Sequence, residues 1–120
     1  MRSSNVSLGK IGENASVLFL RNQGFKILKR NLRVNIGEID IIASKQSVLY
    51  VFEVKTRRNT THGQPYEAVT PVKAKRLQMM GEKFALQNNL KDSKLSLGVI
   101  AVLVDESDKV ATIKIYDYFQ

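Results

Sequence analysis

The stretch GEIDIIASKQSVLYVFEVK, residues 37–55, decides the fold, because it contains two short strands joined by a polar link. Residues 38–43 and 48–55 are rich in β-branched and aromatic side chains, and residues 44–47 between them are polar. Two such runs with so short a link favour an antiparallel hairpin. We therefore place this hairpin at the centre of a sheet.

The residues before the hairpin predict a helix and one further strand. Apolar side chains recur at helical spacing over residues 7–22, and Gly24 is well placed to end that helix in a left-handed cap. Residues 25–33 look extended, and residues 35–37 carry a turn signal.

The residues after the hairpin predict a second helix and two more strands. Residues 57–65 are polar and read as a loop. Thr70 as N-cap and Pro71 at the first helical position predict a helix that runs to about Asn88. Residues 95–104 form a nearly continuous apolar run, which is typical of a buried strand, and a turn leads to a last strand at 110–116. The order α-β-β-β-α-β-β predicts an α/β protein with a mixed central sheet flanked by helices.

Length and composition indicate one globular domain over residues 1–120. Apolar residues make up 43% of the chain, and there is no cysteine, which excludes disulfides and zinc–thiolate sites. No apolar run is long enough to cross a membrane, and the N-terminus lacks the apolar region of a secretory signal. A cytoplasmic location and no contact with a membrane are the expectations.

The net charge of +8 is concentrated in the middle of the chain. Residues 21–76 carry 12 basic and 4 acidic side chains, while the remainder balances at 7 of each. Such a concentration of positive charge attracts polyanions, and nucleic acid is the commonest of these. The alternative is a basic surface without a partner.

Carboxylates inside the central hairpin are the most informative residues. Strand alternation places Glu53 and Lys55 on one face of their strand, and it places Asp40 opposite Ile39 and Ile41. Burying an unpaired carboxylate costs free energy, so something must compensate Asp40 and Glu53. Lys55 and a neighbouring arginine could form ion pairs with them. Alternatively the carboxylates hold a divalent cation.

A carboxylate pair with a lysine in a basic field favours phosphodiester hydrolysis over a purely structural role. Mg²⁺ or Mn²⁺ takes oxygen ligands and keeps several waters, so two or three acids from adjacent strands suffice. The metal would polarise the phosphate and activate a water, and Lys55 would offset charge that develops on phosphorus.

Several motifs of the chain resemble the YraN-type family of small bacterial proteins. The resemblance covers about residues 8–104 and rests on the following segments: Gly12-Glu13, Asn31 with Arg33, Gly37-Glu38-Ile39-Asp40-Ile41-Ile42-Ala43, Val51-Phe52-Glu53-Val54-Lys55-Thr56-Arg57, Gly63, Pro65, Glu67-Ala68-Val69 and Lys73. One segment departs from the family pattern, because Ser96-Leu97-Gly98 stands where Arg-Phe-Asp is usual.

This resemblance implies a restriction-endonuclease-like fold of the PD-(D/E)xK nuclease superfamily, which includes Holliday-junction resolvases. By resemblance, Asp40 takes the aspartate position, Glu53-Val54-Lys55 takes the (D/E)xK triplet, and Glu13 takes the helix glutamate of resolvase-like members. Asp40, Glu53 and Glu13 are then the expected metal ligands. Glu38 is a weaker candidate, either for orienting a metal-bound water or for capping the strand. A homodimer is expected by the same analogy.

The expected function is therefore metal-dependent cleavage of nucleic acid, in particular DNA. Six basic residues are candidates for phosphate contacts, with solvated surface as the alternative for most of them: Arg33, Arg57, Arg58, Lys73, Lys75 and Arg76. His62 is interpreted as an exposed loop residue. Tyr66 is the one aromatic residue that we keep as a candidate for stacking on a nucleic-acid base. The rival functions are a non-catalytic nucleic-acid-binding module and a small basic scaffold that contacts a ribosome or a protein.

Overall fold

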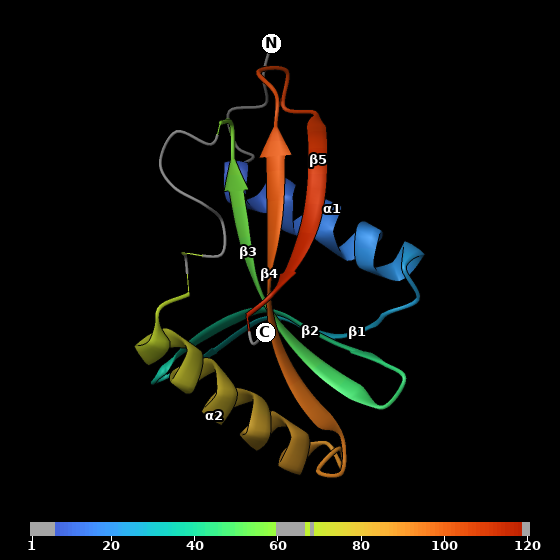
Figure 1. Ribbon diagram of the computed structural model, residues 1–120, viewed down its shortest axis with the longest axis vertical. Coiled ribbons are helices and arrows are strands. Elements are labelled where there is room, and N and C mark those ends of the chain that lie inside the picture. Colours follow the sequence, from blue (N-terminus) through green and yellow to red (C-terminus); the bar gives the residue numbers. More distant parts are fainter. Residues whose placement is uncertain (1–6, 60–66, 68, 119–120) are drawn as a thin grey trace.

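The computed structural model describes residues 7–59, 67 and 69–118, and these residues form one five-stranded sheet with two helices (Figure 1). The predicted order α-β-β-β-α-β-β is confirmed. The elements are α1 (Leu8–Asn22), β1 (Lys26–Val34), β2 (Gly37–Lys45), β3 (Val48–Arg57), α2 (Pro71–Gln87), β4 (Lys94–Val104) and β5 (Val110–Asp117).

The sheet has the strand order β1-β2-β3-β4-β5 and is mixed, as predicted. All neighbouring strands pair antiparallel except β3 and β4, which are parallel. A parallel pair needs a crossover connection, and α2 lies in that connection.

Local capping signals place the helix ends where the sequence predicts them. The Ser7 hydroxyl accepts a hydrogen bond from the Lys10 N–H at 3.2 Å, and Gly24 follows α1 with a φ of +91°, a conformation that glycine adopts at little cost. In α2, the Thr70 hydroxyl accepts from the Lys73 N–H at 3.2 Å, and Pro71 opens the helix.

Two core clusters cover the two faces of the sheet. Val51 packs with Leu77 of α2, whereas its neighbour Phe52 packs with Leu20 of α1. Because successive side chains of a strand point to opposite faces, the two helices lie on opposite sides of β3. Gly98, in the segment 96–98 that differs from the family pattern, pairs with Phe52. A Cβ at position 98 would lie 3.0 Å from the Phe52 ring, so a side chain there would crowd the core on that face.

The central hairpin is antiparallel, as predicted, but its strands separate at one end. Gln46 and Ser47, both with positive φ, connect the strands, and pairing runs from Lys45 with Val48 to Ile41 with Phe52. Beyond that pair, β2 continues against β1, while β3 continues against β4. The sheet therefore forks after Ile41 and Phe52, and Asp40 and Glu53 are the first residues past this point.

The predicted alternation of β2 is wrong at Ile39. Ile39 packs in the cluster on the α2 side and Ile41 in the cluster on the α1 side, although the sequence places both on one face. The physical reason is the fork, because the twist of β2 is no longer constrained by pairing with β3 beyond Ile41.

Candidate functional site

Asp40 lies at the fork of the sheet, and its side chain bonds to β3 where backbone pairing between β2 and β3 has stopped. Its Oδ2 accepts a hydrogen bond from the backbone N–H of Val54 at 2.8 Å. The carboxylate thus binds β3 just where the backbone ladder between β2 and β3 has ended. This bond fixes a half-buried acid between the two arms of the sheet.

Burial and neighbouring acids raise the pKa of Asp40 from its ordinary value of 3.8 to about 6. Loss of water is the largest cause, and the negative charges of Glu53, Glu38 and Glu13 add to it. The Val54 N–H acts in the opposite direction, because it stabilises the ionised form. The structure therefore brings the carboxylates of Glu53, Glu38 and Glu13 into electrostatic range of Asp40.

Glu53 forms an ion pair with Lys73, which lies in the first turn of α2. The Lys73 ammonium donates to Oε2 of Glu53. This contact corrects one sequence-based alternative, because Lys55 and an arginine were the expected partners of the hairpin acids. It also gives Lys73, a candidate for phosphate contact, a partner within the chain.

Glu13 is buried in α1, and residues of β1 hold it in place. Its Oε1 accepts hydrogen bonds from Arg30 Nε at 2.9 Å and from Asn31 Nδ2 at 2.9 Å, and Arg30 Nη2 lies 2.6 Å away. Asn31 has a φ of +53°, and asparagine tolerates this left-handed conformation better than most residues. Sequence reasoning missed the role of Arg30, since nothing in β1 by itself indicates which arginine faces α1.

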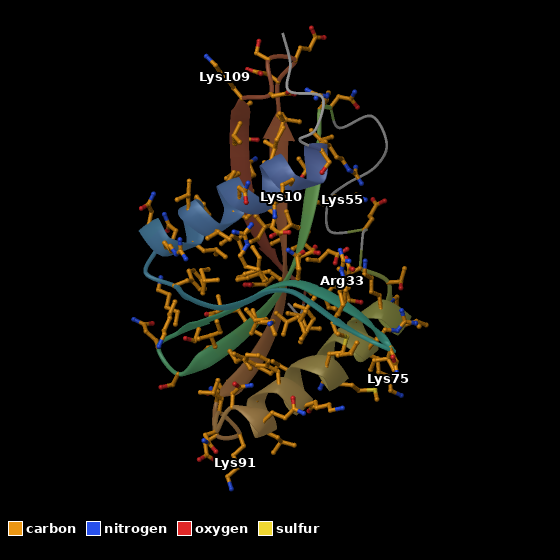
Figure 2. The ribbon with its side chains drawn as sticks, turned by 180° about the vertical axis from the view of Figure 1, so that it is seen from behind. Lys10, Arg33, Lys55, Lys75, Lys91 and Lys109 are labelled. Carbon is orange, nitrogen blue, oxygen red and sulfur yellow. The ribbon has the colours of Figure 1, made fainter. Side chains whose placement is uncertain are left out.

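Lys55 lies on the arm of β3 that pairs with β4 beyond the fork, opposite Ala101. It is half-buried, and within the described part of the chain no ion pair involves it. In Figure 2, Lys55, Arg33 and Lys75 lie along one side of the molecule, whereas Lys109 and Lys91 lie at its two ends.

The remaining basic candidates divide into exposed and engaged side chains. Lys75 and Arg76 are exposed on α2, and Arg33 is an exposed partner of Glu38 at 3.2 Å. Arg58 instead donates to the Asp105 carbonyl and to the Asp108 carboxylate, both at 2.6 Å. Its guanidinium therefore supports the turn between β4 and β5. Arg57 ends β3, and His62 and Tyr66 lie outside the described residues.

Asp40 and Glu53 carry the kind of oxygen donor that a hard divalent cation takes. Among residues 7–59, 67 and 69–118, no group of three histidine, cysteine or acidic side chains is arranged to hold a metal ion. Asp40 and Glu53 nevertheless offer carboxylate oxygens, and Mg²⁺ is commonly held by one or two carboxylates plus water. Glu53 already has one cationic partner, the Lys73 ammonium.

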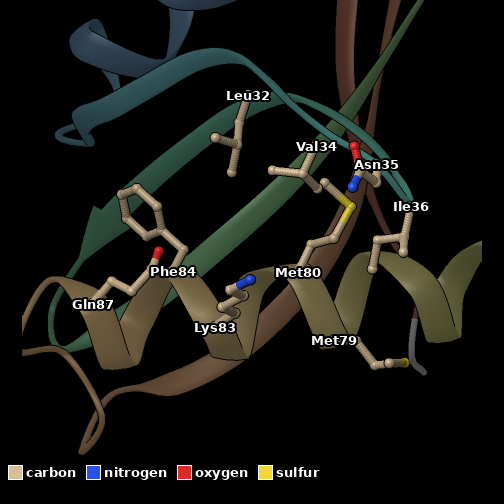
Figure 3. A pocket seen from close by; sticks show the side chains of 9 residues that line it. All are labelled: Leu32, Val34, Asn35, Ile36, Met79, Met80, Lys83, Phe84 and Gln87. Carbon is tan, nitrogen blue, oxygen red and sulfur yellow. The ribbon is translucent and has the colours of Figure 1, made fainter.

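A groove of about 660 Å³ lies apart from these carboxylates, between α2 and the turn that joins β1 and β2 (Figure 3). None of the acids at the fork lines it. The lining residues are Leu32, Val34, Asn35, Ile36, Met79, Met80, Lys83, Phe84 and Gln87.

Within the described residues, neither helix is long and apolar enough to span a membrane.

The fold and the fork together define the class: a small α/β protein with a mixed five-stranded sheet, two helices on opposite sides of β3, and acidic side chains where the sheet divides. Residues 12–102 match the family described as "Uncharacterised protein family UPF0102". The chain therefore belongs to the UPF0102 family, and the predicted YraN-type relationship is confirmed.

Relatives in this family resemble the chain over most of its length. A UPF0102 protein of Dictyoglomus thermophilum is 38% identical over 107 residues, which cover 89% of this chain and 91% of the relative. A UPF0102 protein of Geotalea daltonii is 41% identical over 102 residues, with 85% and 80% covered. Among solved structures, a fdxN element excision controlling factor protein from Anabaena variabilis aligns with a TM-score of 0.39 at 16% identity, covering 87% of this chain and 98% of that one.

Proposed function

We propose that this protein is a metal-dependent endonuclease that hydrolyses phosphodiester bonds of DNA. The observation that carries the proposal is Asp40, a half-buried acid whose pKa is raised to about 6 by burial and by three neighbouring carboxylates. A raised pKa means that ionising Asp40 at neutral pH costs free energy in the folded state. Strongly perturbed carboxylates of this kind concentrate at functional sites.

Asp40 and Glu53 are the residues that would hold Mg²⁺ or Mn²⁺. When bound, the ion would polarise the scissile phosphate and lower the pKa of an attacking water. Lys55, on the same arm as Glu53, would offset negative charge that develops on phosphorus. Glu13, fixed through Oε1 by Arg30 and Asn31, is proposed as an auxiliary ligand or general base.

Cleavage in the presence of Mn²⁺ is the direct test. Purified protein is incubated with linear, flapped and four-way DNA in Mn²⁺, in Mg²⁺ and in EDTA. We expect cleavage with either metal and none in EDTA, because the carboxylates alone cannot activate water. Cleavage that persists in EDTA, or protein that neither cleaves nor gains thermal stability with Mn²⁺, would contradict the proposal.

A non-catalytic nucleic-acid-binding module is the second candidate. It is favoured by the ion pairs of Glu53 with Lys73 and of Glu13 with Arg30, which compensate two of the acids without a metal. DNA binding without cleavage and without metal-induced stabilisation would support this alternative.

Binding to duplex or branched DNA should depend strongly on salt. Each phosphate contact contributes a slope of about −0.9 in log K against log salt for B-DNA. Lys75→Ala with Arg76→Ala should therefore reduce the slope by up to about 2, because both side chains are exposed on α2, the helix that also carries Lys73. Fluorescence anisotropy over a salt series measures this change.

The matched control for that experiment is Lys91→Ala with Lys109→Ala. It removes the same charge from the two ends of the molecule (Figure 2), so it should change the slope much less. Equal slopes for the two double variants would show that the charge acts without a defined contact surface. Affinity that does not change with salt would remove DNA as the partner.

A further inference from the structure

Lys73 is held close to the fork by its position at the start of α2. Its backbone N–H donates to the Thr70 hydroxyl at 3.2 Å, and its ammonium donates to Oε2 of Glu53. The Glu53 side chain is 13% exposed and that of Lys73 is 36% exposed. The carboxylate is therefore more enclosed than the lysine that pairs with it.

Anchoring α2 does not require this ion pair. Four side chains of the helix are buried in the cluster on that face of the sheet: Ala74, Leu77, Met80 and Ala85. Ion pairs with a partly exposed lysine contribute little to stability. Lys73 instead acts on the charges at the fork, because its ammonium pairs with the carboxylate of Glu53. The negative charge of Glu53 is one of those that raise the pKa of Asp40.

We propose that the Lys73 ammonium occupies the cation position on Glu53 and thereby sets the affinity of the fork for a divalent cation. A metal ion that takes Glu53 as a ligand has to displace Lys73 first. Lys73 is a positioning residue in this account, because it acts through Glu53. The inference rests on the proposed metal site at Asp40 and Glu53.

Removing the ammonium should tighten binding of the cation. Lys73→Met keeps the length and most of the bulk of the side chain but removes both the competitor and a repelling positive charge. Because each of these changes favours a doubly charged ion on a half-buried carboxylate, we expect Kd for Mn²⁺ to fall about tenfold or more. Lys73→Arg keeps the charge and should bind Mn²⁺ nearly as weakly as the wild type.

Lys75→Met is the matched control. It removes the same charge from the same helix two residues further on, at an exposed position with no ion pair to the carboxylates described here. General loss of positive charge should lower its Kd only slightly. Isothermal titration calorimetry of the full chain with Mn²⁺ in chelator-treated buffer measures all four proteins, and melting in EDTA verifies that each variant is folded.

The outcomes separate the inference from the proposed function. If Lys73→Met binds Mn²⁺ at least tenfold more tightly than Lys75→Met, the inference is supported. If the wild type binds Mn²⁺ and the two methionine variants have the same Kd, or Lys73→Met binds more weakly, the inference is wrong while the metal site stands. If none of the four proteins binds Mn²⁺, the metal site fails and the inference fails with it.

Discussion

Asp40→Asn is expected to stabilise the metal-free protein at pH 8 and to remove the metal-dependent cleavage of DNA that we propose. The pKa of Asp40 is raised in the folded state, from 3.8 to about 6. The favourable contribution of the protonated acid is therefore complete below about pH 4 and is lost as the pH rises through 6. Asparagine resembles the protonated acid, and its side-chain oxygen can still accept from Val54.

The size of this effect follows from the pKa shift. Two pKa units correspond to roughly 3 kcal/mol, and partial solvent screening of the half-buried group reduces this to about 1–2 kcal/mol. Melting in EDTA should accordingly be several degrees higher for Asp40→Asn than for the wild type at pH 8, and the difference should disappear near pH 4.

Asp92→Asn is the control for charge alone, because Asp92 is exposed and lies just before Lys94, which pairs with Val48 at the other end of the central hairpin. We expect no comparable gain from it. If Asp40→Asn instead lowers the melting temperature at pH 8 in EDTA, the ionised carboxylate is a structural partner, and the interpretation of Asp40 as a metal ligand loses its support.

Cleavage should respond in the opposite direction to stability. Asparagine removes a negative charge from the proposed cation site while keeping its shape, so metal affinity should fall and cleavage should drop by orders of magnitude. DNA affinity in EDTA should stay level or rise, because one carboxylate no longer repels phosphate. If Asp40 is retained for function, its replacement by asparagine should raise stability and lower activity.

Gly12→Ala is expected to be the most destabilising single-methyl change in α1. A Cβ at this position would lie 1.7 Å from Oγ1 and 2.8 Å from Cβ of Thr56 in β3. The helix would have to move away from the sheet and would carry Glu13 with it. Overpacking of this kind costs about 1–3 kcal/mol or more, so the melting temperature should fall by roughly 10 °C.

Gly9→Ala is the matched control, because nothing lies within 4 Å of a Cβ at that position. Alanine is the better helix former, so this variant should melt at the same temperature or slightly higher. Combining Gly12→Ala with Thr56→Ala should recover part of the loss, since the clashing hydroxyl is then absent. Equal melting of the Gly9 and Gly12 variants would show that α1 does not depend on this close approach.

Elements and their ends were predictable because their signals are local. Thr70 and Pro71 mark the start of α2, Gly24 marks the end of α1, and residues 37–55 carry their hairpin in one short run. The same stretch also identified Asp40 and Glu53 as candidates, because acids in strands that are otherwise built for burial require compensation.

Partners of these acids were not predictable, since they come from distant parts of the chain. Lys73 lies 20 residues from Glu53, and Arg30 lies 17 residues from Glu13. Several basic residues could have served equally well on sequence grounds, and the packing of α2 and β1 selects among them. The same holds for Arg58, which the fold directs to the turn between β4 and β5.

The helices, the strands, the central hairpin and the acidic residues followed from the amino-acid order alone, because periodicity, caps and composition act over a few neighbouring residues. The position of the fork, the face that Ile39 takes and the cationic partner of each carboxylate became known only from the folded chain. Strand twist and charge pairing depend on residues that packing brings together. These residues are far apart in the sequence, and no local pattern indicates which of them will be in contact.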